Sequence, residues 1–370
     1  MSLSSVAKLF LKLGLIGFGG PAVHIAMMKD EVVMKRGWMN ENHFLDLIGA
    51  TNLIPGPNST ELAMHIGHER AGVKGLLVAG CCFIVPAVII TGVFAWLYQQ
   101  YGQLPEVQPF IYGIKPAIIA VVFSLMIQLG RKALKTSTLV FIGILSAAAV
   151  LAGFHEILVL FGSGGLGILL HLFKKDGQNI RSIFPLVLLQ FPFRIFSPSS
   201  TELFFIFLKI GSILYGSGYV LFAFLDAELV SRGLLTKQQL TDAIAVGQFT
   251  PGPVFSSATF IGWQIDGAAG ALMATLGIFL PSFLFVGLLN PLLPFLRRSP
   301  VMSAFLDTVN VAAVAIILSV LVELGRSSIA DWRSVVIAIV SFGVTFRFRK
   351  INTAFIILGG ALLGYGLIFI

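Results

Sequence analysis

Long apolar runs separated by short polar connections dominate the sequence. The run over residues 75–98 holds no charged residue, and about 20 apolar residues are enough for a helix to cross a bilayer. Lipid offers no water to unpaired backbone groups, and no barrel-like alternation appears, so all these segments are predicted to be helices. The predicted apolar helices lie at 75–98, 110–130, 136–154, 157–173, 267–296, 308–322, 334–346 and 351–370.

The composition supports this assignment. Hydrophobic residues make up 56% of the chain and charged residues 11%, whereas soluble domains carry about 25% charged residues. The net charge of +8 comes from short basic runs between apolar segments, which are typical of membrane orientation signals and unlike a nucleic-acid-binding stripe. We therefore expect a multi-pass protein of the cell (inner) membrane, with lipid around it and no nucleic-acid partner.

The second half of the chain repeats the first at nearly constant spacing. Phe10-Leu11-Lys12 recurs as Phe207-Leu208-Lys209, and Pro55-Gly56-Pro57 recurs as Pro251-Gly252-Pro253. Other recurring pairs are Gly14 and Gly211, Glu31 and Glu228, Asp46 and Asp242, Gly72 and Gly267, Gly75 and Gly270, and Pro86 and Pro281. A tandem duplication is predicted, with repeats at 1–173 and 201–370 and a linker at 174–200.

Basic residues indicate that the two repeats have opposite orientations. In the first repeat, seven Lys and Arg residues lie in the connections near residues 70, 131 and 174, and none lies at 99–109 or 153–156. In the second repeat, the corresponding connections hold two and the alternate ones hold five. Because basic connections stay in the cytoplasm, the repeats are predicted to be inverted, as in secondary transporters. The fold class is an all-α membrane protein of two inverted-topology repeats.

Each repeat is interrupted at Pro-Gly-Pro inside an apolar stretch, where an α-helix cannot continue. Such a break is tolerated in a membrane only where protein or a water-filled cavity receives the freed backbone groups. Helices starting after the breaks would direct two N-termini to the middle of the membrane, where they favour an anion. The alternative is a pair of structural kinks with ordinary caps. The candidate substrate-binding residues are Asn52, Pro55, Gly56, Pro57, Asn58, Ser59, Thr60, Gln248, Thr250, Pro251, Gly252, Pro253, Ser256 and Ser257.

A Gly-rich break precedes each Pro-Gly-Pro segment. Phe18-Gly19-Gly20-Pro21 in the first repeat is matched loosely by Tyr215-Gly216-Ser217-Gly218 in the second. Glycine here permits either an unwound helix or close backbone packing without ligand contact. The break adds Gly19, Gly20, Pro21 and Gly216 to the candidate substrate-binding residues.

Ionisable residues within apolar segments are further candidates. Lys12 and Lys209 occupy equivalent positions before the Gly-rich breaks and either neutralise an anion or extend to the membrane interface. Glu31, Glu228 and Glu61 are candidates for carrying a coupling proton, or for pairing with the lysines. Glu61 has no acidic counterpart in the second repeat, where Ser257 aligns with it.

The remaining features exclude other classes of protein. Lys115 lies between apolar flanks but aligns with Asn310, which makes it a weaker candidate, and His24 and His65 are expected to be packed or capping side chains. No nucleotide-binding loop, Ser/His/Asp set or zinc-binding HExxH pattern appears. We therefore expect no enzyme, no metal site and no cofactor.

Several segments resemble the chromate ion transporter family. They are FLKLGLIGFGGP at the start, Gly37-Trp38, Asp46, PGPNSTELAMHIG, the glycines of AGVKG, and LGGALLG near the C-terminus. The resemblance covers nearly the whole chain and matches the long form made of two fused, inverted domains. It implies proton-driven efflux of chromate, in which the Gly-rich and Pro-Gly-Pro segments take part. The second repeat departs from it at Gly216-Ser217-Gly218 and at Ser257.

Together these features predict a secondary active transporter, an antiporter, that exports a tetrahedral oxyanion, with chromate first and sulfate second. An anion channel without coupling is one alternative, and a membrane enzyme or assembly subunit is another. The partners expected are the oxyanion, protons and lipid. Direction, coupling stoichiometry and the question of a homodimer are left open by the sequence.

Overall fold

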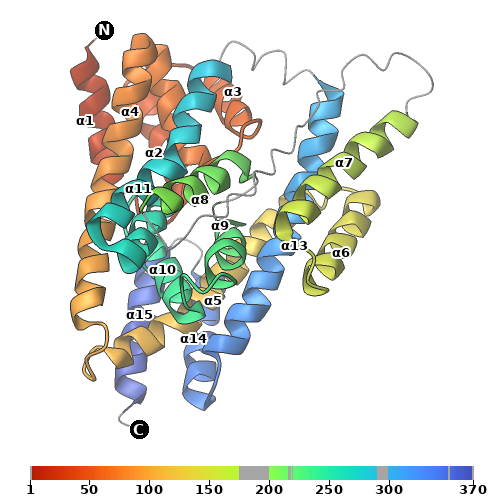
Figure 1. Cartoon of the computed structure of the whole chain (residues 1–370). Helices are drawn as coiled ribbons and strands as arrows, with labels where there is room; N and C mark the ends of the chain where they lie inside the picture. Colours follow the sequence, from red (N-terminus) through yellow and green to blue (C-terminus); the bar gives the residue numbers. More distant parts are fainter. Residues whose placement is uncertain are drawn as a thin grey trace.

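The computed structural model describes residues 2–174, 200–215, 218, 220–289, 299–348 and 351–368, and every regular element within these residues is a helix (Figure 1). The first repeat contains α1 (Leu3–Ile16), α2 (Pro21–Lys29), η1 (Asp30–Lys35), α3 (Glu41–Thr51), α4 (Asn58–Tyr101), α5 (Gln108–Ala133), α6 (Ser137–Leu151) and α7 (Glu156–Lys174). The second contains α8 (Ser200–Ile213), α9 (Val220–Leu225), η2 (Asp226–Val230), α10 (Lys237–Phe249), η3 (Val254–Ser256), α11 (Ser257–Leu289), α13 (Pro300–Ser328), α14 (Trp332–Arg347) and α15 (Thr353–Leu367). The predicted linker, apart from Lys174 and Ser200, lies outside the described residues, and so does Gly216.

Five of the described helices are long and apolar enough to cross a membrane. They are α4, α5, most of α7, the segment from η3 through α11, and α13. Their lipid-facing sides show as stripes of exposed apolar side chains with helical spacing. The stripe on α11 consists of Leu272, Leu276, Leu280, Leu284 and Leu288, and the equivalent stripe on α4 consists of Leu77, Cys81, Val85, Ile89 and Val93. A water-facing surface seldom exposes so continuous an apolar patch.

Both α4 and α11 turn back sharply near their beginnings. The backbone is non-helical at Ala71 and Gly72 in α4, and at Asp266 and Gly267 in α11. Gly72 and Gly267 have φ of +59° and +56°, which favours glycine. Each element is therefore a short helix, a tight turn and a long helix, so the short helices leading from the Pro-Gly-Pro breaks do not cross the membrane on their own.

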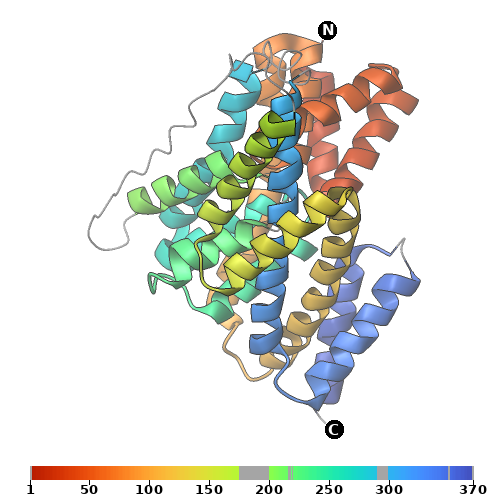
Figure 2. The same ribbon diagram turned by 90° about the vertical axis from the view of Figure 1, so that its right-hand side faces the viewer.

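The two repeats exchange their last helices. Within each repeat the first helix packs on the long one, α1 on α4 and α8 on α11, and α4 also packs on α11. In contrast, α6 and α7 pack on α13, whereas α14 and α15 pack on α5. In Figure 1, α5 ascends and α13 descends, and the two chain ends lie at opposite ends of the molecule in both side views (Figures 1 and 2). This arrangement fits the predicted inverted repeats.

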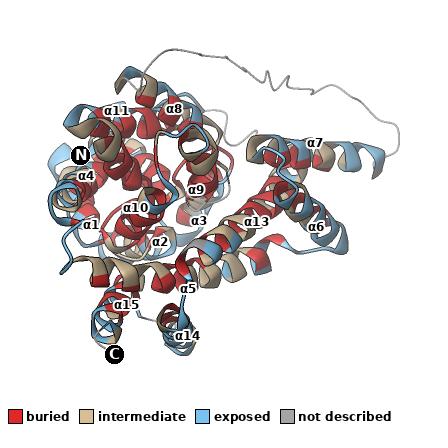
Figure 3. Ribbon diagram, turned by 60° about the horizontal axis from the view of Figure 1, so that its bottom comes forward, coloured by how far each residue is buried: buried red, intermediate tan, exposed pale blue. Residues whose placement is uncertain are grey.

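The buried core surrounds the second repeat's broken segment. Figure 3 shows mostly buried residues in α9 and α10 and on the inward faces of α4 and α11. Every residue of α10 from Leu240 to Gln248 is buried, whereas in α3 only Phe44, Leu47, Ala50 and Thr51 are buried. The two equivalent helices therefore have different surroundings.

One predicted helix was too short. The apolar run at 308–322 belongs to α13, which extends from Pro300 to Ser328. The charges that bounded the predicted run do not end the helix, because Asp307 pairs with Lys135 at 3.1 Å and Glu323 pairs with Lys237. Lys135 in the connection between α5 and α6, and Lys237 of α10, thus accommodate the two carboxylates.

Candidate functional site

The first Pro-Gly-Pro segment forms the tip of a re-entrant hairpin. Helix α3 ends at Thr51 and α4 begins at Asn58, so the break predicted from the sequence separates two helices. Gly56 has φ of +136°. A Cβ there would lie 2.2 Å from the Glu61 carboxylate and 2.6 Å from the Ser282 hydroxyl. Only glycine fits this position without displacement. We call the segment 41–70 the first hairpin.

The second Pro-Gly-Pro segment has the same form. Helix α10 ends at Phe249, and one turn of 3₁₀-helix leads from the break into α11. Gly252 has φ of +90°, and a Cβ there would lie 2.5 Å from that of Ala87. We call the segment 237–266 the second hairpin. Each tip thus lies against the long helix of the opposite repeat.

Backbone hydrogen bonds join each tip to the opposite repeat. The Gly56 amide donates to the Leu214 carbonyl at 2.9 Å, and the Gly252 amide donates to the Gly17 carbonyl at 2.7 Å. Gly17 and Leu214 follow the first helices of the two repeats, so the pair of bonds is itself repeated. The carbonyls left unpaired at the ends of α1 and α8 are thereby satisfied.

Hydroxyl side chains are buried at both helix starts. Ser59 and Thr60 begin α4, whereas Ser256 and Ser257 lie between η3 and α11, and all four are at most 1% exposed. The Thr60 and Ser257 hydroxyls have no hydrogen-bond partner among the described residues. Most buried polar groups are paired, so these two hydroxyls are exceptions among the described residues.

The other hydroxyls and amides of the predicted site bond within the protein. Thr91 donates to Ser256 at 3.2 Å. The Asn58 amide donates to the Asn52 side chain at 2.8 Å. Thr250 bonds back to the Val246 carbonyl at 2.8 Å, and Gln248 is buried in α10. The structure therefore brings Ser59, Thr60, Ser256 and Ser257 to the helix starts. Gln248 lies within the preceding helix α10, and Thr250 directly follows it.

The Gly-rich break of the first repeat directly follows Gly17, whose carbonyl accepts the hydrogen bond from the second tip. Gly19 and Gly20 have φ of +108° and +80°, and Pro21 opens α2. The Asn352 amide, from the end of the second repeat, donates to the Phe18 carbonyl at 3.2 Å. This break therefore unwinds the chain between α1 and α2, as expected for a glycine-rich segment.

His24 connects the Gly-rich break to the start of α4. Its Nε2 lies 2.8 Å from the Gly17 carbonyl, and its Nδ1 lies 3.3 Å from the Ser59 hydroxyl. Because a carbonyl only accepts, Nε2 carries a hydrogen. The sequence suggested a packed or capping histidine, and the structure places it beside the candidate residue Ser59.

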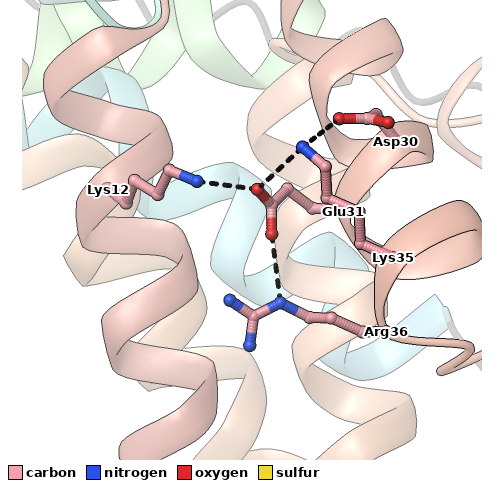
Figure 4. Close-up of polar contacts among 5 residues, drawn as sticks. All are labelled: Lys12, Asp30, Glu31, Lys35 and Arg36. Carbon is pink, nitrogen blue, oxygen red and sulfur yellow. Dashed lines mark hydrogen bonds and ion pairs between the residues drawn. The ribbon is translucent and has the colours of Figure 1, made fainter.

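Both candidate lysines form ion pairs with candidate glutamates, and Figure 4 shows the cluster around Lys12 and Glu31. Lys12 donates to Glu31 at 2.7 Å, and Lys209 donates to Glu228 at 2.5 Å. Arg36 also donates to Glu31 at 3.1 Å, and Lys35 lies 3.6 Å away. The hydrogen bond from Lys12, helped by the hydrogen bond from Arg36 and by the positive charge of Lys35, lowers the pKa of Glu31 to about 2. The sequence left ion pairing open as one role, and each lysine has a carboxylate partner.

Glu61 differs from these carboxylates. Its side chain is fully buried. One oxygen accepts a hydrogen bond from Ser282 of α11 at 3.4 Å, and the other has no partner among the described residues. No Lys or Arg ion pair to Glu61 occurs in the described part of the chain. Its counterpart Ser257 carries no charge, so the two tips differ in chemistry.

Three residues of the long helices were not predicted for this region. Ser282 contacts the first tip, while Ala87 and Thr91 contact the second. The sequence held a signal for two of them: Ala87 and Ser282 directly follow Pro86 and Pro281, which are equivalent in the two repeats.

These features define a class of protein: an all-helical, multi-pass membrane protein built from two repeats. The chromate transporter family matches the chain twice, over residues 4–168 and 201–365. The chain belongs to this family, and it is therefore a protein of the cell membrane from a transport family.

Named relatives span nearly the whole chain. A probable chromate transport protein of Synechococcus elongatus is 30% identical over 94% of this chain and 91% of its own. The chromate transport protein of Cupriavidus metallidurans is 28% identical over 98% and 92%, and that of Pseudomonas aeruginosa is 27% identical over 99% and 92%. No solved structure matches the chain.

Proposed function

We propose that the protein exports chromate across the cell membrane in exchange for protons, and that the substrate binds between the starts of α4 and α11. Relatives named as chromate transport proteins align over both repeats. The observation that carries the proposed site is that the buried hydroxyls of Thr60 and Ser257, at the two helix starts, have no partner among the described residues. Hydroxyl groups donate hydrogen bonds to the oxygens of an oxyanion.

The charge of the substrate is balanced mainly by backbone groups in this proposal. Lys12 and Lys209 each contact a carboxylate, which offsets their charge. Each helix N-terminus acts as about half a positive charge, and free N–H groups in the first turn bind anions. Two such termini compensate part of the charge of a dianion, and Asn58, Ser59, Thr60, Ser256 and Ser257 add polar contacts.

Glu61 is the carboxylate we assign to the coupling proton. Glu31 and Glu228 are held by lysines, whereas Glu61 lies at the first tip with one oxygen unpartnered among the described residues. A carboxyl group buried without a cation favours its neutral form and gains a proton readily.

Uptake of labelled chromate into everted membrane vesicles tests the function. We expect accumulation that needs an imposed proton gradient, stops with a protonophore and is competed by unlabelled chromate. Sulfate competition decides how far the site accepts other tetrahedral dianions. Uptake that ignores the proton gradient but follows the membrane potential would indicate an anion channel instead.

Variants then test the site. Replacing Pro55-Gly56-Pro57 or Pro251-Gly252-Pro253 by three alanines allows the helix to continue and occupies the free N–H groups in its own backbone bonds. We expect chromate uptake to fall at least about tenfold with normal membrane insertion, because a lost charged contact costs about 1.5–3 kcal/mol. In Glu61→Gln, the exchange of labelled for unlabelled chromate in the absence of a gradient should remain, and the stimulation of uptake by a proton gradient should be lost. Glu106→Gln, in an exposed turn, is the control and should keep both. Normal uptake in both triple-alanine variants would exclude the proposed site.

A further inference from the structure

One face of α4 contacts the second hairpin along most of its length. The contacts recur every three or four residues, as expected for one face of a helix. In order along α4, they are those of Ala87 with Gly252, Thr91 with Ser256, Phe94 with Phe249, and Tyr98 with Asp242. Because the hairpin belongs to the second repeat and α4 to the first, this face joins the two repeats.

The far end of this face carries a buried charged cluster. Asp242 of α10 is 3% exposed. Its Oδ2 accepts a hydrogen bond from the Tyr98 hydroxyl at 2.6 Å, and its Oδ1 lies 3.6 Å from the Lys115 ammonium of α5. The lysine balances the charge without a close hydrogen bond. A buried ion pair of this kind adds little net stability and can separate when its surroundings change.

Two of the described positions equivalent to this cluster differ around the first hairpin. Its aspartate, Asp46, is exposed on α3, and the residue matching Lys115 is the neutral Asn310. The contacts of Gly56 and Glu61 with Ser282 hold the tip of the first hairpin against α11. The second hairpin is thus enclosed, and the first is partly exposed. Inverted repeats commonly alternate between two such arrangements during transport.

We propose that Tyr98, Lys115 and Asp242 form a latch that holds the second hairpin against α4 and α5, and that transport requires the latch to open. The three are positioning residues, because they act on the substrate through the position of Gly252 and Ser256. Packed interfaces switch between discrete arrangements, and a weak buried ion pair allows the hairpin to dock and undock.

Thiol labelling tests the latch without relying on the proposed transport function. In a Cys81→Ala, Cys82→Ala background, Ala245→Cys places a thiol on enclosed α10. We expect slow reaction with a membrane-impermeant maleimide, and reaction at least about tenfold faster after Asp242→Asn or Lys115→Met. Acceleration should appear from one side of the membrane only. Cysteines at the exposed positions Gln103 and Ser137 give the reference rates for the two sides.

Rescue separates a latch from general damage to the fold. The charge exchange Lys115→Asp with Asp242→Lys should restore slow labelling, and Lys115→Arg should retain it. Unchanged labelling in Asp242→Asn, or fast labelling in both rescue variants, would overturn the latch.

Transport kinetics give a second readout, which rests on the proposed function. Tyr98→Phe and Lys115→Met should change the maximal rate of chromate uptake and leave the apparent KM within about twofold, whereas Lys115→Arg should change neither. A raised KM at an unchanged maximal rate would instead make Lys115 a substrate ligand and overturn the proposal. If no variant or wild-type protein moves chromate, the transport assignment fails while the labelling result still stands.

Discussion

At the scale of single residues, the Pro-Gly-Pro glycines matter for their backbone angle and for their missing side chain. Gly56 combines φ of +136° with contacts that a Cβ would make at 2.2 Å and 2.6 Å. Its amide also bonds to the opposite repeat. A glycine in this setting keeps the tip, Glu61 and Ser282 in contact.

Gly56→Ala should therefore destabilise the protein and reduce chromate uptake. Strain in the backbone costs about 1–3 kcal/mol, and overpacking adds about 1–3 kcal/mol. Thermal unfolding in detergent should show a lower Tm. Gly165→Ala, in α7 with open space around it, should leave both properties unchanged. A Tm equal to that of the wild type would contradict this account of Gly56.

Glu31 gives a prediction for pH. Its pKa is lowered to about 2 by Lys12, Arg36 and Lys35, so its ionised form stabilises the folded protein. A lowered pKa contributes stability above the ordinary value of about 4.3, and that contribution is lost as pH falls towards the folded value. The Tm difference between wild type and Glu31→Gln should be largest near neutral pH and shrink below about pH 5.

Lys12→Met provides the control for this pH dependence. In that background Glu31→Gln should have a smaller effect, because residues in contact are not additive. A Tm difference that is independent of pH, or equal in both backgrounds, would show that the ion pair does not set the stability of this cluster.

At the scale of elements, the sequence predicted the breaks and missed their partners. Proline lacks an N–H and glycine adopts positive φ, so the ends of α3 and α10 could be predicted locally. The bond between Tyr98 and Asp242, by contrast, joins residues 144 positions apart. Such contacts depend on how helices pack in space, for which one sequence holds no local signal. The repeated glycines at 72 and 75 were visible, but their role as a turn was not.

The turn within α4 depends on two glycines that face one another. A Cβ at Gly67 would lie 2.3 Å from the Gly75 carbonyl, and one at Gly75 would lie 2.0 Å from the Gly67 carbonyl. We expect Gly67→Val to separate the short and long helices, displace the first tip and lower the Tm. Gly262 and Gly270 make the same approach in α11, so Gly262→Val should act alike. Wild-type stability in both variants would contradict a requirement for this close packing.

At the scale of the whole molecule, the exchange of helices makes the repeats interdependent. Because α6 and α7 pack on α13 while α14 and α15 pack on α5, neither repeat completes its own packing. The duplication could be predicted from the sequence because matching residues recur in order. The exchange of the last helices between the repeats could not be predicted. The same pattern of hydrophobic residues allows these helices to pack within a repeat or between repeats.

The orientation of the repeats leads to the last prediction, which concerns membrane topology. Basic residues concentrate near Arg131 and Lys132 in the first repeat and near Arg347 in the second, and such residues stay in the cytoplasm. Reporter fusions at Lys132 and at Arg347 should both report the cytoplasm, whereas fusions at Gln103 and after residue 370 should report the outside. Lys132 and Gln103 lie at or beyond opposite ends of α5, which gives an internal check within one helix. If Lys132 and Arg347 report opposite sides, the repeats are not inverted, and two helix N-termini cannot converge on one anion from opposite directions.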